Sequence, residues 1–153
     1  MYSLTGITLL WICFVRFADA SCLDGWLKHG GTCYHFSSTQ MDWSGAKVMC
    51  EAMTGQLVEI DTTDENYYLG QHVKSTGRSY WIALIDITEE GIWMWMNSHT
   101  KPSFYTWEPN EPNNGGNENC VDMHPNGLWN DAPCDVIHYF ICEKPDETEI
   151  VGK

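Results

Sequence analysis

The segment from Trp107 to Cys134 concentrates side chains that could bind a metal ion. Its oxygen-bearing groups stand in two successive Glu-Pro-Asn triplets at 108–113, then at Asn114, Glu118, Asn130 and Asp131. Ca²⁺ takes about six to eight oxygen ligands from carboxylates, carboxamides and backbone carbonyls. Asn, Gly, Pro and Asp are also ordinary turn residues, but here cysteines and tryptophans flank the cluster, and a simple solvated loop seldom needs such anchors. The segment therefore favours a calcium site.

The beginning of the chain has the pattern of a secretory signal. An apolar run from Leu4 to Phe17 precedes Ala18-Asp19-Ala20, a small-x-small cleavage site. This pattern predicts a signal peptide over residues 1–20, although it lacks an early Lys or Arg. The run is too short for a membrane span of about 20 apolar residues, so we expect a secreted, extracellular protein. The remaining length predicts one domain over residues 21–145 and an acidic C-terminal tail over residues 146–153.

Six cysteines remain once the signal peptide, which contains Cys13, is removed. An even number in a secreted chain implies three disulfides, but the spacing leaves many pairings open. No Cys-x-x-Cys pair occurs, which argues against a zinc site or a thioredoxin-type redox site. The six are Cys22, Cys33, Cys50, Cys120, Cys134 and Cys142.

The formal net charge of −13 makes some partners unfavourable. Nucleic acid and anionic membrane surfaces would be repelled, whereas calcium and other cations are attracted. Acidity would also suit an acidic structural or biomineral-matrix protein, which is the alternative to a binding module. A hydrolase is the weakest option, because the paired carboxylates come without a nucleophile elbow or a His-bearing zinc motif. We therefore expect no enzyme.

Two helices and several short strands must position the acidic segment. Residues 42–53 have apolar side chains at spacings of three and four, which predicts a first helix. Thr62-x-x-Glu65 is a capping box, which predicts the start of a second helix that reaches about Lys74 and is ended by Gly77. Between 97 and 126 the regular signals fade, which predicts a long functional loop. The expected strands, with a hairpin within 22–33, are 32–36, 56–60, 80–85, 92–96, 128–129 and 137–142.

The tryptophans and His124 have simple structural explanations. Tryptophans on strand-like runs are expected in the core rather than stacked on a ligand. His124 lies near the acidic segment and is expected at the surface. The tryptophans concerned are Trp81, Trp93, Trp95 and Trp129.

Taken together, these residues resemble a C-type lectin domain over nearly the whole mature chain, from Cys22 to Glu143. The resemblance rests on Trp81-Ile82-Ala83-Leu84, close to the family's Trp-Ile-Gly-Leu strand, on Glu-Pro-Asn, on Trp129-Asn130-Asp131 and on the six cysteines. It implies an α+β fold, with two helices flanking small antiparallel sheets and a long calcium-binding loop, in the long form with an extra N-terminal hairpin. It also implies the disulfides Cys22–Cys33, Cys50–Cys142 and Cys120–Cys134.

Two adjacent triplets could provide the sugar-binding residues. In the family, a tryptophan stands four residues before the Glu of the triplet, and a partner Glu follows that Glu by seven or eight, two before a cysteine. Trp107 stands four residues before Glu111, and Glu118 follows Glu111 by seven; for Glu108 the spacings are one and ten. The resemblance therefore favours the second triplet, Glu111-Pro112-Asn113.

With this choice the resemblance implies a principal calcium site whose ligands also hydrogen-bond two neighbouring sugar hydroxyls, with a cis peptide bond before Pro112. It also implies an auxiliary calcium site that shares Glu118. Asn119 stands where the family often has Asp, so the auxiliary site would have one charge fewer. The principal ligands are Glu111, Asn113, Glu118, Asn130 and Asp131; the auxiliary ones are Asp86, Glu90, Asn114 and Asn119.

The order Glu-Pro-Asn carries a specificity in the family. It accompanies mannose-type ligands with equatorial 3- and 4-hydroxyls, including glucose, N-acetylglucosamine and fucose, whereas Gln-Pro-Asp accompanies galactose. The resemblance thus implies mannose-type glycans as partners and a role in innate immune recognition. A single open site binds weakly, so avidity would need multivalency, for instance in a homo-oligomer. The sequence has no coiled-coil or collagen-like segment to build one.

Overall fold

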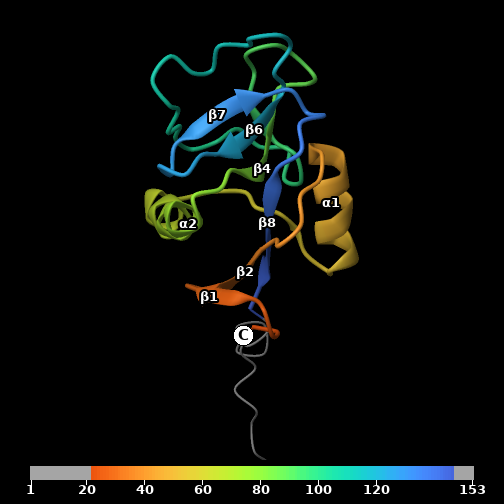
Figure 1. The fold of residues 1–153 in the computed structure, drawn as a ribbon, viewed down its shortest axis with the longest axis vertical. Coiled ribbons are helices and arrows are strands. Elements are labelled where there is room, and N and C mark those ends of the chain that lie inside the picture. The colour runs from red at the N-terminus through yellow and green to blue at the C-terminus, as the bar shows by residue number, and fades with distance from the viewer. Residues whose placement is uncertain (1–21, 147–153) are drawn as a thin grey trace, which may run out of the picture.

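The computed structural model describes residues 22–146, so the expected signal peptide and residues 147–153 of the expected tail lie outside the described residues. Two helices, α1 (Trp43–Ala52) and α2 (Thr63–Thr76), lie on opposite sides of strand β8 (Figure 1). This is the predicted α+β arrangement. The strands are β1 (Leu27–His29), β2 (Thr32–Phe36), β3 (Gln56–Leu57), β4 (Tyr80–Ile85), β5 (Met94–Trp95), β6 (Cys120–Met123), β7 (Trp129–Ala132) and β8 (Tyr139–Pro145).

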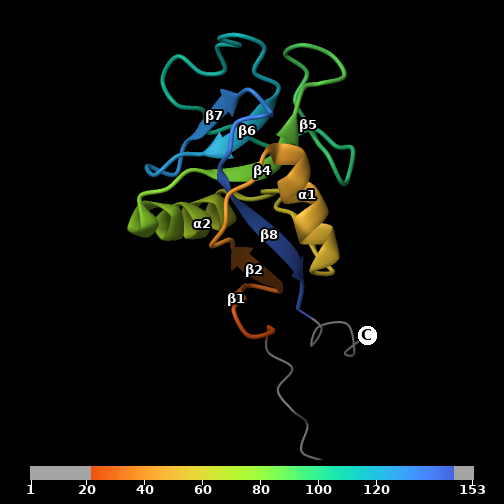
Figure 2. The same ribbon diagram turned by 45° about the vertical axis from the view of Figure 1, so that its right-hand side comes forward.

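The strands form one sheet path in the order β1-β2-β8-β4-β6-β7, with β3 added to β8 and β5 to β4. Every pairing is antiparallel except that between β4 and β8. The hairpin of β1 and β2 lies at one end of the molecule, and the long loop between β5 and β6 lies at the other, above β7 (Figure 2). Strand β8 therefore connects the hairpin end to the strands that carry the loop.

Both helices begin and end within two residues of the predicted positions. The Asp42 carboxylate accepts the Gly45 N–H at 2.6 Å, which caps α1. The Thr62 hydroxyl accepts the Glu65 N–H at 3.2 Å, and Gly77, with φ of 66°, ends α2 in the left-handed conformation. These contacts satisfy N–H groups that have no partner within the helix. Among the described residues, no helix is long and apolar enough to cross a membrane.

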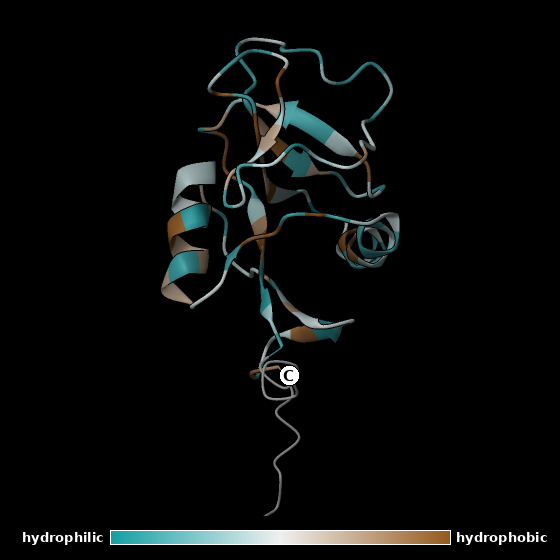
Figure 3. Cartoon of the chain, turned by 180° about the vertical axis from the view of Figure 1, so that it is seen from behind, coloured by the Kyte–Doolittle hydropathy of each residue, from teal (hydrophilic) through white to brown (hydrophobic). Residues whose placement is uncertain are grey.

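The predicted tryptophan core is confirmed. Trp81, Trp93, Trp95 and Trp129 are each at most 5% exposed. The Trp129 ring lies 5.5 to 6.0 Å, centroid to centroid, from the rings of Trp95, Phe104 and Trp107. Brown, hydrophobic segments run through the strands, whereas the long loop is mostly teal and white (Figure 3). The polar loop is therefore anchored on aromatic residues at its base.

Three disulfides join the pairs that the resemblance implies: Cys22–Cys33, Cys50–Cys142 and Cys120–Cys134. The first closes the hairpin end, and the second ties α1 to β8. Cys120 begins β6, and Cys134 follows β7, so the third bond clamps together the two strands beneath the long loop.

The structure corrects several sequence-based boundaries. Residues 120–123 were expected in a loop, but they form β6, which pairs with both β4 and β7. The strands expected at 56–60 and 92–96 shorten to β3 and β5. Asp146, the first residue of the expected tail, is 1% exposed, and its carboxylate pairs with the Lys28 ammonium. Strand β6 could not be predicted locally, because its pairing with β4 depends on residues that are distant in sequence.

Candidate functional site

The second Glu-Pro-Asn triplet folds back on itself at the top of the molecule. The Glu111–Pro112 peptide bond is cis. The Asn113 side-chain amide donates to Glu111 Oε2 at 2.6 Å. The side chains of Glu111 and Asn113 therefore lie together at the surface of the loop.

Asp131 of β7 fixes this part of the loop to the sheet. Its side chain is 1% exposed. Asp131 Oδ1 accepts the backbone N–H of Asn113 at 3.0 Å, and Oδ2 accepts that of Asn114 at 2.8 Å. One buried carboxylate on a strand thus holds two consecutive loop residues over the end of β7.

Glu118 joins the same group of side chains. Its backbone N–H donates to Asn114 Oδ1 at 2.8 Å, and its Oε2 accepts the Gly115 N–H at 2.7 Å. A Cβ added to Gly115 would lie 2.6 Å from Asn113 Oδ1 and 3.3 Å from Glu118 Oε2. Two oxygens expected to bind calcium therefore lie beside Gly115, where a Cβ would force the Asn113 amide to shift.

The chemistry of this group fits a cation. Burial raises the pKa of Glu111, and the neighbouring carboxylates of Asp131 and Glu118 raise it further, whereas the Asn113 amide lowers it. A divalent cation would relieve the repulsion among three carboxylates, and carboxylates with carboxamides are the ligand types that Ca²⁺ takes. Within residues 22–146, no three His, Cys, Asp or Glu side chains already surround a metal position. The loop N–H groups occupy oxygens of Asp131 and Glu118 instead.

Asn130 precedes Asp131 on β7, and its side-chain amide has a partner on β6. Asn130 Nδ2 donates to Asp122 Oδ1 at 3.0 Å. Asp122 lies on β6 and is fully buried. Sequence reasoning missed Asp122, since the only signal is a lone acidic residue among the apolar residues of β6.

The expected auxiliary ligands lie close to the principal group. Asp86 is 2% exposed; its Oδ2 accepts the Gly91 N–H at 2.8 Å, and its Oδ1 is buried without a hydrogen-bond partner in residues 22–146. Burial raises the pKa of Asp86, the Gly91 N–H lowers it, and the charge of Asp131 raises it. Burial, Asp86 and Asp131 also raise the pKa of Glu90. Asn119 contributes its backbone carbonyl, which accepts the Asp86 N–H at 3.3 Å.

The first triplet has different surroundings. Glu108 Oε1 accepts the Asn126 side-chain amide at 2.5 Å, and Glu108 Oε2 lies 3.1 Å from His124 Nδ1. The expectation of a surface position for His124 was only partly right, because its other nitrogen lies 3.3 Å from the buried Asp122 Oδ2. Glu108 thus contacts the turn between β6 and β7, whereas Glu111 contacts Asn113.

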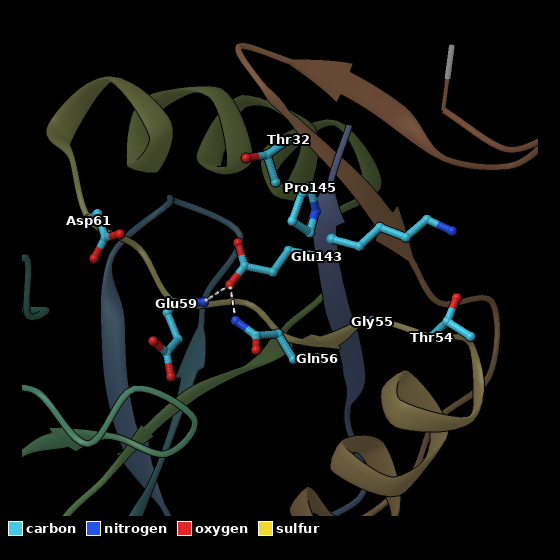
Figure 4. A pocket seen from close by; sticks show the side chains of 9 residues that line it. Thr32, Thr54, Gly55, Gln56, Glu59, Asp61, Glu143 and Pro145 are labelled. Carbon is cyan, nitrogen blue, oxygen red and sulfur yellow. Dashed lines mark hydrogen bonds between the residues drawn. The ribbon is translucent and has the colours of Figure 1, made fainter. Parts of the chain in front are cut away.

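A separate cavity of about 410 Å³ lies beside β3 and the end of β8 (Figure 4). Glu143 Oε1 accepts hydrogen bonds there from Gln56 Nε2 at 3.0 Å and from the Glu59 N–H at 2.9 Å. Burial raises the pKa of Glu143 to about 7, and the charges of Glu65 and Glu59 add to the rise. The residues lining this cavity include none of the expected calcium ligands.

Comparison with known proteins decides the family. Residues 39–144 match the family model described as the lectin C-type domain. The chain belongs to the C-type lectin family. One relative of this C-type lectin is C-type lectin domain family 4 member M of Gorilla gorilla gorilla, 38% identical over 126 residues, which are 81% of this chain and 33% of the relative. The chain thus spans about a third of the length of the first curated relatives that it matches.

Solved structures of C-type lectins share the fold. The mouse scavenger receptor C-type lectin carbohydrate-recognition domain superposes with a TM-score of 0.78 at 32% identity, covering 82% of this chain and 98% of that one. The carbohydrate-recognition domain of cow CD23, solved in the presence of a GlcNAc2Man3 oligosaccharide, gives 0.76 at 34% identity, covering 82% and 96%. The expected α+β lectin fold is therefore confirmed. Members of the family are in general carbohydrate-binding proteins rather than enzymes.

Proposed function

We propose that this C-type lectin is a secreted, calcium-dependent protein that binds mannose-type sugars through Glu111-Pro112-Asn113. The observation that carries the proposal is the contact network of four expected ligands: Asn113 and Glu118 lie beside Gly115, and Asn113 is hydrogen-bonded to Glu111 and Asp131. The proposed mature protein begins at Ser21 and has the long form of the domain, with the hairpin of β1 and β2. Residues 1–20 would be its signal peptide and residues 146–153 its acidic tail.

In the proposed site, carboxylates and carboxamides have different roles. A bound Ca²⁺ supplies coordination positions for two neighbouring sugar hydroxyls. Glu111 and Glu118 accept hydrogen bonds from such hydroxyls, whereas the Asn113 and Asn130 amides donate to them. Asp131 holds the loop through two backbone N–H groups and offers its carboxylate to the same cation. Asp86, Glu90, Asn114 and Asn119, with Glu118, would hold an auxiliary calcium ion.

The order of acceptor and donor in the triplet sets the proposed specificity. A diol with equatorial 3- and 4-hydroxyls meets a carboxylate on one side and an amide on the other, so mannose, glucose, N-acetylglucosamine and fucose are the expected ligands. The presence of a mannose-containing oligosaccharide with the cow CD23 domain supports this class of ligand. Recognition of glycans in innate immunity is the proposed role, with a homo-oligomer supplying avidity.

A mannose-agarose pull-down of the refolded, oxidised mature protein tests the proposal. Retention with calcium, release by EDTA, and competition by mannose but not galactose are expected. The double variant Glu111→Gln, Asn113→Asp should shift preference towards galactose. The matched control is Glu108→Gln with Asn110→Asp in the first triplet, which should keep mannose binding.

Two outcomes would contradict the proposal. Mannose binding that survives the change in the second triplet but not the change in the first would assign the site to Glu108 and Asn110. Calorimetry that detects no calcium binding, together with adsorption to calcium carbonate that survives both double variants, would favour the acidic matrix protein.

A further inference from the structure

Asp122 combines complete burial with a direct contact to Asn130, a proposed ligand of the calcium and sugar site. Its side chain is fully buried on β6. Its Oδ1 accepts the Asn130 amide at 3.0 Å, while its Oδ2 faces His124 Nε2 at 3.3 Å and His138 Nε2 at 3.9 Å. Burying a carboxylate is costly unless its oxygens find partners. An apolar residue would fill this strand position at a lower cost, so the carboxylate calls for an explanation.

The sheet holds Asp122 and Asn130 in a fixed relation. The two residues are directly opposite each other in the ladder between β6 and β7. Directly opposite side chains on antiparallel strands lie within contact distance. Strand β6 is enclosed by β4 on its other side, and the Cys120–Cys134 disulfide clamps β6 to the end of β7. The sheet therefore keeps the backbones of the two residues side by side.

The contact distinguishes the two ends of the Asn130 carboxamide. A carboxamide has one acceptor oxygen and an NH₂ group with two donors. Asp122 Oδ1 accepts from Asn130 Nδ2. The reversed amide would put its oxygen against the carboxylate and leave a buried acceptor without its donor, which is unfavourable. The amide oxygen and the second N–H are thereby left for other partners.

We propose that Asp122 is a positioning residue for the calcium and sugar site, because it fixes the orientation of the Asn130 amide. The inference rests on the proposed function of Asn130 as a calcium ligand. In that orientation Asn130 Oδ1 serves the cation, and the second Nδ2 proton serves a sugar hydroxyl. Outer partners of this kind typically change metal affinity by about 10- to 100-fold when removed.

Two substitutions at position 122 separate the hydrogen bond from simple packing. Asp122→Leu keeps the number and branching of the heavy atoms, with bulkier methyl groups, but removes the acceptor. We expect calcium affinity to fall by about 10- to 100-fold, with a parallel loss of mannose retention. Asp122→Asn keeps an oxygen that can accept from Asn130, so calcium and mannose affinity should stay close to those of the parent protein. Glu143→Gln is the matched control, because it alters a carboxylate on β8 that contacts Gln56 and Glu59 instead of Asn130. It should change neither the calcium affinity nor the mannose affinity.

NMR of the calcium-free parent protein gives a readout that does not depend on binding. One Asn130 Nδ2 proton should exchange slowly with solvent, and the protection should persist in Asp122→Asn and vanish in Asp122→Leu. A folded Asp122→Leu variant that binds calcium and mannose like the parent would overturn the inference. So would an Asp122→Asn variant as damaged as Asp122→Leu.

The remaining outcomes also decide the matter. If Asp122→Leu fails to fold, the exchange of the Asn130 side-chain amide protons decides. Rapid exchange of both protons in the parent overturns the inference. Slow exchange of one of them, in the parent and in an Asp122→Asn variant that still binds calcium and mannose, supports it. If the parent itself binds neither calcium nor mannose, the proposed function fails and the inference falls with it. Failure of the inference alone leaves binding by the parent intact.

Discussion

Replacing Glu143 by Gln should stabilise the protein in alkaline solution. Glu143 lines the cavity beside β3, where its carboxylate accepts hydrogen bonds from Gln56 and from the Glu59 N–H (Figure 4). Burial is the main reason why its pKa rises to about 7, and nearby Glu65 and Glu59 add to the rise. The folded state therefore holds the Glu143 proton more tightly than the unfolded state does.

The sign and the size of the effect follow from this difference. The contribution of Glu143 to stability is complete below its ordinary pKa of 4.5 and is lost as the pH rises through about 7. At about 1.4 kcal/mol for each pH unit, the difference between 4.5 and about 7 corresponds to about 3 kcal/mol above pH 7. Because Glu143 keeps some contact with solvent, we expect about 1 to 3 kcal/mol. A glutamine side chain at this position has no proton to lose, so the variant avoids this loss.

Urea unfolding of the two oxidised proteins in EDTA, followed by tryptophan fluorescence between pH 4 and 9, measures the difference. The variant and the parent should have nearly equal free energies of unfolding near pH 4, and the variant should be more stable by about 1 to 3 kcal/mol at pH 8.5. Glu51→Gln on the exposed face of α1 is the control and should show no such gain. A Glu143→Gln variant that is less stable at pH 8.5, or a difference that does not change with pH, would refute the reasoning.

Three further predictions concern the calcium site. Gly115→Ala should weaken calcium binding at least about tenfold, because the new Cβ would lie 2.6 Å from Asn113 Oδ1; calorimetry measures this, and unchanged affinity would contradict the proposed convergence of ligands. Mannose retention should fall as the pH drops from neutral to about 4, because calcium needs ionised carboxylates. Burial, Asp131 and Glu118 raise the pKa of Glu111, so this carboxylate becomes protonated at a higher pH than an ordinary Glu. Column retention that is constant down to about pH 4 would count against it. Calcium at about 100 times its Kd should raise the free energy of unfolding by about 2.7 kcal/mol. Glu111→Gln should remove most of that gain. Thermal melts of both proteins with calcium and with EDTA measure the difference.

Local signals explain why much of the fold could be predicted. The Asp42 cap, the Thr62 capping box and Gly77 act on neighbouring backbone groups, so their positions in the sequence specify where helices begin and end. The tryptophans stand on short apolar runs, and burial of such large rings is the simplest outcome. Strand β6 lacks such a signal. It exists because β4 and β7 pair with it from both sides, and those strands are distant in sequence or separated from it by a turn.

In the candidate site, too, local patterns predict some features, whereas others depend on how the strands pair. Residue types and spacing favoured the second triplet, and the fold places Asn113 and Glu118 beside Gly115 and joins Asn113 to Glu111 by a hydrogen bond. Their role as calcium ligands stays a prediction. The roles of Asp122 and His124 depend on the register between β6 and β7, which no local pattern specifies. The contact of Glu108 with Asn126 likewise depends on how the turn after β6 folds back.

The hairpin end of the molecule offers a way to attach the protein to other materials. Cys22 is bonded to Cys33 of β2, and the Asp146 N–H donates to the Gly31 carbonyl at 2.8 Å, so both ends of the described chain meet at the β1–β2 hairpin. The long loop lies at the far end (Figure 2). A bead, a fluorescent protein or a multimeric scaffold attached at the hairpin end would therefore lie at the opposite end of the domain from the loop.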